Sequence, residues 1–185
     1  MDDLEKLGPL KHLVGTWEGD QGVDVAFQHS KGSIGETPFR ERTTFSAFGP
    51  VDNGPQCLYG LDYRMAAWRG DEENPFHTEI GYWLWDAAEG QVLRCFLVPR
   101  GTMVLAGGDA TADATSFSLT AKCGSEEYGI LSNRYLAQEA RTTDYSCLVT
   151  CDGNTYSYES TVVVDLPKYC GTMQHTDTNT LKRVS

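Results

Sequence analysis

The sequence predicts an all-β protein: a closed antiparallel β-barrel of about ten strands, with a short helical turn at its N-terminus. Strand-type residues and 19 glycines recur along the chain, and helical periodicity is almost absent after residue 14. The chain opens with Gly-Thr-Trp-Glu-Gly at residues 15–19 and ends in a strand-like segment that contains a histidine. We therefore expect the first and last strands to close one barrel, with residues 1–185 forming a single domain.

The N-terminal turn is predicted from leucines at helical spacing. Leu4, Leu7 and Leu10 could share one helical face, but Gly8 and Pro9 interrupt it. A short, broken helix or 3₁₀ turn that covers one end of the barrel fits this pattern.

The strands are predicted from alternating segments that are separated by turn residues. The turn-rich segments are 28–37, 48–55, 70–75, 86–90, 107–109, 152–154 and 167–171. The expected strands are 13–25, 39–45, 57–68, 77–85, 91–98, 102–106, 116–122, 130–137, 143–150, 155–164 and 173–184. About ten strands at a spacing of roughly 8–12 residues are typical of a barrel or a sandwich.

Charge and composition exclude several classes of partner. The formal net charge of −11 disfavours nucleic acid and anionic membranes, because an acidic surface repels phosphate. Residues 1–6 do not resemble a signal peptide, and no segment reaches transmembrane length, so a cytoplasmic location is expected. The six cysteines contain no C-x-x-C pair, which predicts free thiols rather than a zinc site. The sequence leaves a homodimer open.

Two of the four histidines lie at strand positions, and these are the candidate site residues. His175 shares a strand face with Met173, Asp177, Asn179 and Leu181, but periodicity does not say whether that face points inward. A neutral imidazole on such a strand could bind haem iron and leave its sixth position open.

If His77 points inward, Glu79 shares its face. A carboxylate that points into a barrel needs a partner, for which an arginine is the candidate. The alternative is that the Glu79 charge lies at the mouth of the barrel.

Three segments together resemble the nitrobindins, haem-binding barrels related in fold to fatty-acid-binding proteins and lipocalins. They are Gly-Thr-Trp-Glu-Gly at 15–19, Phe-His-Thr-Glu-Ile-Gly-Tyr at 76–82, and Gln-His-Thr-Asp-Thr-Asn-Thr-Leu-Lys-Arg at 174–183. Their order and approximate spacing extend over nearly the whole chain. One segment departs from the family: residues 19–27 lack the Tyr-Pro-Thr-Ile element that follows the opening motif in nitrobindins.

The resemblance implies haem b near one mouth of the barrel, with His175 as the axial iron ligand and His77 on the distal side. Thr16 and Gly19 of the opening motif would also contact the cofactor. It further implies nitric oxide binding and peroxynitrite isomerase activity.

Two other functions remain open from the sequence alone. The first is a non-enzymatic carrier of a fatty acid, a tetrapyrrole or another small apolar ligand. The second is a barrel filled with tryptophan and tyrosine side chains that acts through protein contacts. The presence of an internal cavity would distinguish haem binding and the carrier function, which both need one, from the filled barrel, which has none.

Overall fold

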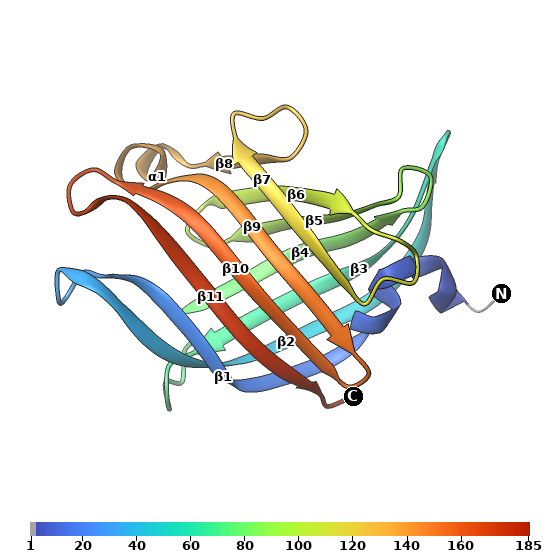
Figure 1. Ribbon diagram of the computed structural model, residues 1–185, viewed down its shortest axis with the longest axis horizontal. Helices are drawn as coiled ribbons and strands as arrows, with labels where there is room; N and C mark the ends of the chain where they lie inside the picture. The colour runs from blue at the N-terminus through green and yellow to red at the C-terminus, as the bar shows by residue number, and fades with distance from the viewer. Residues whose placement is uncertain (1–2) are drawn as a thin grey trace.

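The chain folds as a closed barrel of eleven strands in the computed structural model, which describes residues 3–185 (Figure 1). The helices are η1 (Asp3–Leu13) and α1 (Arg134–Glu139). The strands are β1 (Gly15–Gln28), β2 (Ser33–Asn53), β3 (Gln56–Trp68), β4 (His77–Asp86), β5 (Gln91–Val98), β6 (Thr102–Asp109), β7 (Ser116–Cys123), β8 (Gly129–Ser132), β9 (Arg141–Asp152), β10 (Thr155–Leu166) and β11 (Gly171–Arg183).

The first and last strands close the barrel, as the sequence predicts. The order around it is β1-β11-β10-β9-β7-β8-β6-β5-β4-β3-β2, and β2 pairs with β1. Trp17 lies opposite Arg183 in the β1–β11 pair. The pairings are antiparallel except between β7 and the short β8, which makes the sheet mixed rather than purely antiparallel.

One end of the barrel is covered by η1, which confirms the prediction of a broken 3₁₀ turn. Its leucines Leu7, Leu10 and Leu13 are buried, and its backbone kinks at Gly8, whose φ is +56°. The indole Nε1 of Trp17 donates a hydrogen bond to the backbone oxygen of Leu13, at 2.7 Å. Figure 1 shows η1 and the C-terminus at this covered end, with the β1–β2 and β10–β11 turns at the opposite end.

Four expected boundaries were wrong. The segment 107–109 is not a turn, because pairing with β5 extends β6 to Asp109. The polar segment 28–37 turns only at residues 29–32, because pairing with β1 extends β2 back to Ser33. The segment 48–55 stays in β2 as far as Asn53, with an irregularity in the β2–β3 pairing between Phe48 and Val51. Segment 130–137 is not one strand, because the Asn133 side chain accepts a hydrogen bond from the backbone nitrogen of Leu136 and caps α1.

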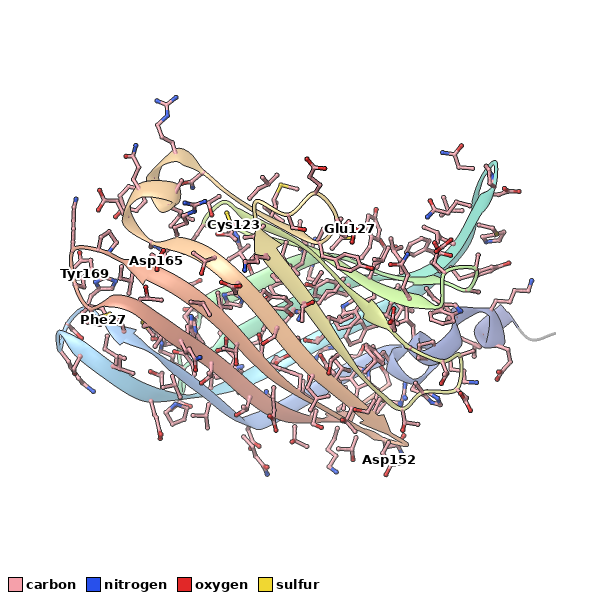
Figure 2. All side chains as sticks on the ribbon, turned by 45° about the horizontal axis from the view of Figure 1, so that its top comes forward. Phe27, Cys123, Glu127, Asp152, Asp165 and Tyr169 are labelled. Carbon is pink, nitrogen blue, oxygen red and sulfur yellow. The ribbon has the colours of Figure 1, made fainter. Side chains whose placement is uncertain are left out.

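The core lies between η1 and the opposite mouth, where side chains fill the inside of the barrel (Figure 2). Many of its buried side chains are aromatic. Trp83 and Phe45 contact each other edge to face, and Tyr63 stacks on Phe45. Neither helix among residues 3–185 is long and apolar enough to cross a bilayer.

Candidate functional site

A small cavity at the uncovered end brings together the two strand histidines. It has a volume of about 70 Å³, and its lining includes His77 from β4 and His175 from β11. Asp24 from β1 and Asp177 from β11 also line it. We call this cavity and its rim the histidine mouth.

The inward face of β11 is the one that carries His175. Asn179 and Leu181 lie four and six residues after His175, on the same face of β11. Their side chains are buried in the barrel, with exposed fractions of 4% and 0%. Closure of the sheet therefore settles the orientation that the alternation pattern left open.

His175 forms an ion triad with two aspartates. Its Nε2 lies 2.6 Å from Asp24 Oδ1 and 3.5 Å from Asp177 Oδ2. Burial favours the neutral ring, but hydrogen bonds to Asp177 and Asp24 outweigh it and raise the pKa of His175 to about 10. The ring is therefore a cation at neutral pH, held between two carboxylates.

His77 belongs to a second charged group, deeper in the barrel. Its Nε2 lies 3.2 Å from Glu79 Oε1, and the other Glu79 oxygen pairs with the guanidinium of Arg94 at 2.5 Å. The Tyr63 hydroxyl donates to the same Glu79 oxygen at 2.8 Å. Burial opposes ionisation of Glu79, but Arg94 and His77 overcome it and lower its pKa to about 2. The expected arginine partner of Glu79 is thus Arg94.

A fourth carboxylate, Glu41, is also buried beside the cavity. It accepts hydrogen bonds from Thr43, Tyr158 and Asn179. Despite these three donors, burial raises its pKa. The cavity thus has an acidic wall, and Arg94 is committed to Glu79 rather than free to meet a ligand carboxylate.

A single family is identified by comparison with known proteins. A family model described as "THAP4-like, heme-binding beta-barrel domain" matches residues 6–183. The chain belongs to this family. No curated protein matches its sequence.

A solved relative has the same barrel fold. The crystal structure of Rv2717c from M. tuberculosis superimposes with a TM-score of 0.69 and 18% sequence identity. The match covers 100% of this chain and 99% of that one. At this identity the likeness establishes the fold alone.

Membership of the THAP4-like family supports haem binding and implies a small-molecule ligand. The surroundings of His175 determine whether this chain's own residues fit haem. An imidazole binds a metal through a nitrogen lone pair, but Asp24 occupies the space in front of Nε2. The cavity of about 70 Å³ is also well below the roughly 300–1,000 Å³ of pockets for drug-sized ligands. As arranged, these residues do not fit a haem held inside the barrel through His175.

An acyl chain fits no better. Four carboxylates face this cavity, on Asp24, Glu41, Glu79 and Asp177. Burying an alkyl chain against ionised groups would desolvate them without giving them a partner.

Thr16 and Gly19, the other expected site residues, do not line the histidine mouth. The backbone nitrogen of Thr16 donates to the terminal Ser185 oxygen at 2.8 Å, and so Thr16 lies toward the covered end. A Cβ on Gly19 would lie 2.7 Å from the Thr180 oxygen, so this glycine allows β1 to approach β11 closely. Both residues have structural roles in closing the barrel.

The sequence analysis missed Asp24 as a site residue. Asp24 lies between Val23 and Val25, and nothing in β1 alone separates it from a surface aspartate. Its place follows from the β1–β11 register, in which it lies opposite Asp177. Asp177 shares the strand face of His175. This shared face was the one signal in the sequence that could have indicated an acidic group beside His175.

Proposed function

We propose that the histidine mouth binds a small ligand, and that a divalent metal ion held by Asp24, His175 and Asp177 is the ligand that its geometry favours. The observation that carries this proposal is the convergence of the three side chains. One ligand atom from each lies within 4.8 Å of the other two. An imidazole nitrogen and two carboxylates form a donor set that suits Zn²⁺, Mn²⁺ or Fe²⁺.

The charges at the mouth support a cation there. Asp24 and Asp177 are direct cross-strand partners that face inward, and like charges in such a pair repel. The imidazolium of His175 balances one of the two negative charges. A divalent ion that replaces its proton would balance both, and the two carboxylates that hold the proton would become ligands.

The inner side of the cavity can hold water beside such an ion. Trp83 Nε1 and Arg94 Nε are buried, line the cavity side of the core, and have no acceptor in the described part of the protein. Buried donors of this kind are normally satisfied by water or a ligand. Water molecules there could complete the coordination of an ion that has three protein ligands.

Calorimetric titration of the metal-free protein with Zn²⁺ and Mn²⁺ tests this function. One-to-one binding is expected, and Asp177→Asn should weaken it at least about tenfold, because one charged ligand is lost. Asp62→Asn is the matched control: it makes the same chemical change at an exposed site on β3. Equal affinities for the wild type and Asp177→Asn would refute the metal site.

Haem b is the second candidate, and family membership favours it. In this alternative His175 is the axial ligand and His77 lies on the distal side, and nitric oxide binding or peroxynitrite isomerisation would follow as the resemblance implies. His175 would first have to leave Asp24, and the mouth would have to widen.

A haemin titration followed at the Soret band separates the two candidates. Haem binding through His175 predicts a one-to-one spectral shift that His175→Ala abolishes and His12→Ala retains. His12 is a suitable control because it lies in η1, at the covered end. No shift in the wild type would exclude haem and leave the metal titration as the deciding measurement.

A further inference from the structure

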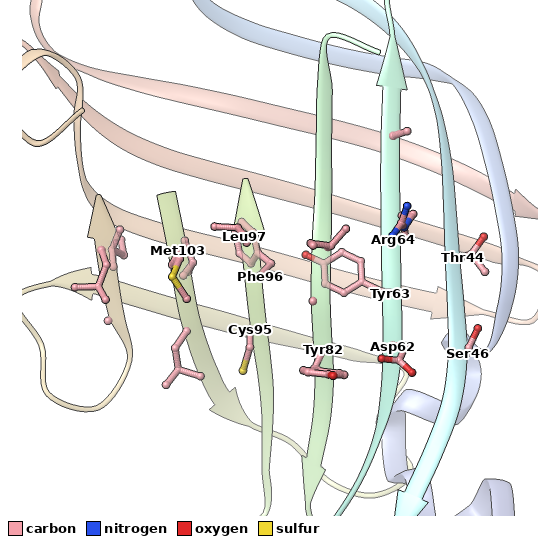
Figure 3. Close-up of a pocket in the computed structure, with 18 of the residues that line it drawn as sticks. Thr44, Ser46, Asp62, Tyr63, Arg64, Tyr82, Cys95, Phe96, Leu97 and Met103 are labelled. Carbon is pink, nitrogen blue, oxygen red and sulfur yellow. The ribbon is translucent and has the colours of Figure 1, made fainter. Parts of the chain in front are cut away.

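The outer face of strands β3, β4, β5, β6 and β8 carries two rows of side chains that point away from the barrel. We call it the outer sheet face, and Figure 3 shows part of both rows. One row runs across the strands through Arg64, Ile80, Leu97, Met103 and Leu131. The other runs through Asp62, Tyr82, Cys95 and Leu105.

The outer sheet face is apolar and exposed. Leu131 is 70% exposed, Met103 53%, Tyr82 49% and Ile80 46%. These side chains line a shallow open hollow of about 1250 Å³, which shares only Tyr63 with the lining of the histidine mouth. The outward face of an antiparallel sheet is usually polar, and contiguous apolar patches on it mark interaction sites.

The opposite side of the same barrel shows the usual pattern. On β11 the side chains of Thr176, Thr178, Thr180 and Lys182 alternate with the inward-facing residues. A continuous row of apolar side chains is therefore not a general feature of the outward faces of this barrel.

The two edges of the outer sheet face carry opposite charges. Arg64 lies on β3 at one edge, is exposed, and has no ion-pair partner within residues 3–185. Glu126 and Glu127 lie in the β7–β8 loop at the other edge and are also exposed. Asp62, two residues before Arg64 on the same outward face, is an acidic group at the Arg64 edge. Arg42 on β2, which lies opposite Ala66, already pairs with Glu18.

We propose that the outer sheet face joins two copies of this chain in a two-fold symmetric dimer. A two-fold axis that lies in the plane of the face, parallel to the central strand β5 near Leu97, would place the Arg64 edge of each copy against the Glu126–Glu127 edge of the other. Such an isologous contact needs a self-complementary patch, and this one has an apolar centre with opposite charges on either side.

The size of the face suits this partner. Together with the bordering strand β2, whose Thr44 and Ser46 also line the hollow, it spans six adjacent strands, about 24 Å at a strand spacing of about 4.8 Å. A standard interface buries about 800 Å² per partner, a patch of similar width. Because each copy carries a net charge of −11, the apolar centre must drive association, and the charged edges set its orientation.

Sedimentation velocity over a range of concentrations tests the dimer. The wild type is expected to sediment with twice the 20.4 kDa mass of one chain at micromolar concentrations, and Leu97→Asp should sediment as a monomer. Leu148→Asp is the matched control, because Leu148 is a similarly exposed leucine, 42% against 37%, on β9 outside this face. A wild type that is still monomeric at about 200 μM, where even a weak specific dimer would form, would overturn the proposal.

A charge swap tests the two-fold arrangement itself. The single variants Arg64→Glu and Glu127→Arg should each raise the dissociation constant of the dimer about tenfold. Each substitution places like charges opposite each other, and the two-fold symmetry makes this repulsion occur twice in the dimer. The double variant should recover most of the wild-type affinity, since the exchanged charges at the two edges would again be opposite across the axis. Failure of the double variant to recover would overturn this arrangement. These measurements need no ligand, so their outcome is independent of what binds at the histidine mouth.

Discussion

The buried ion pair between Glu79 and Arg94 gives the sharpest test of how this barrel interior is stabilised. Both residues are 8% exposed, and the Arg94 guanidinium also lies 4.5 Å from the ring centre of Phe96 and 5.0 Å from that of Trp83. Arg94→Met removes the cation and keeps an unbranched side chain in the same space. It leaves Glu79 buried with only Tyr63 and His77 as polar partners.

Breaking a buried pair from one side costs about 3–5 kcal/mol, because the remaining charge is not compensated. For a protein of this size, that corresponds to a decrease of roughly 10 °C in the melting temperature. The double variant Glu79→Gln/Arg94→Met should lose less stability than the two single variants added together, because it leaves no uncompensated charge.

Urea unfolding at pH 7, followed by circular dichroism, measures these differences in the free energy of unfolding. Circular dichroism is preferable to fluorescence because Trp83 lies beside the altered residue. A single Arg94→Met variant within about 1 kcal/mol of the wild type would contradict the reasoning. Additive losses in the double variant would show that the two residues do not act as a pair.

The Glu79–Arg94 pair also makes the free energy of unfolding depend on pH in the acidic range. The pKa of Glu79 is lowered in the folded protein, so its contribution is complete above its ordinary pKa of 4.5 and is lost as the pH falls to about 2. Glu79→Gln should remove this part of the acid dependence, and an unchanged acid profile would refute the assignment.

Three further predictions concern other parts of the barrel. The raised pKa of His175 stabilises the fold below about pH 6.5 and loses that effect as the pH rises to about 10, so His175→Gln should flatten the decline of melting temperature across this range. Gly81→Ala should destabilise by about 1–3 kcal/mol in urea unfolding, since its Cβ would lie 1.9 Å from the Cys95 backbone oxygen. Arg183→Ala should cost about 2 kcal/mol and speed hydrogen exchange in η1, because the guanidinium donates to the His12 and Val14 backbone oxygens and lies 4.2 Å from the Trp17 ring centre. Unchanged exchange in η1 would argue against this last role.

Much of the fold could be predicted because local patterns determine it. In β3, Leu61 and Tyr63 alternate with Asp62 and Arg64, and in the structure the first two are buried and the last two exposed. The closure by the two terminal strands followed from their motifs. Where local pattern failed, as at β8 and α1, a single side-chain cap at Asn133 decided the outcome.

The site was harder to predict because it depends on register. The sequence identified His77 and His175 as strand histidines, but the partners that determine their chemistry come from other strands. Asp24 reaches His175 across 151 residues of chain, and Arg94 reaches Glu79 from the neighbouring strand. A shift of one residue in the β1–β11 pairing would turn Asp24 outward and remove the triad.

The distribution of stabilising contacts explains how one end of the barrel can hold an unfavourable group of charges. At the covered end, η1 buries Leu7, Leu10 and Leu13, and strand pairing continues to the C-terminus. The opposite end bears two inward aspartates in direct cross-strand register, an arrangement that opposes folding unless a cation lies between them. A barrel closed and anchored at one end can retain such a pair at the other, and two carboxylates that need a cation between them are expected to bind a cationic ligand.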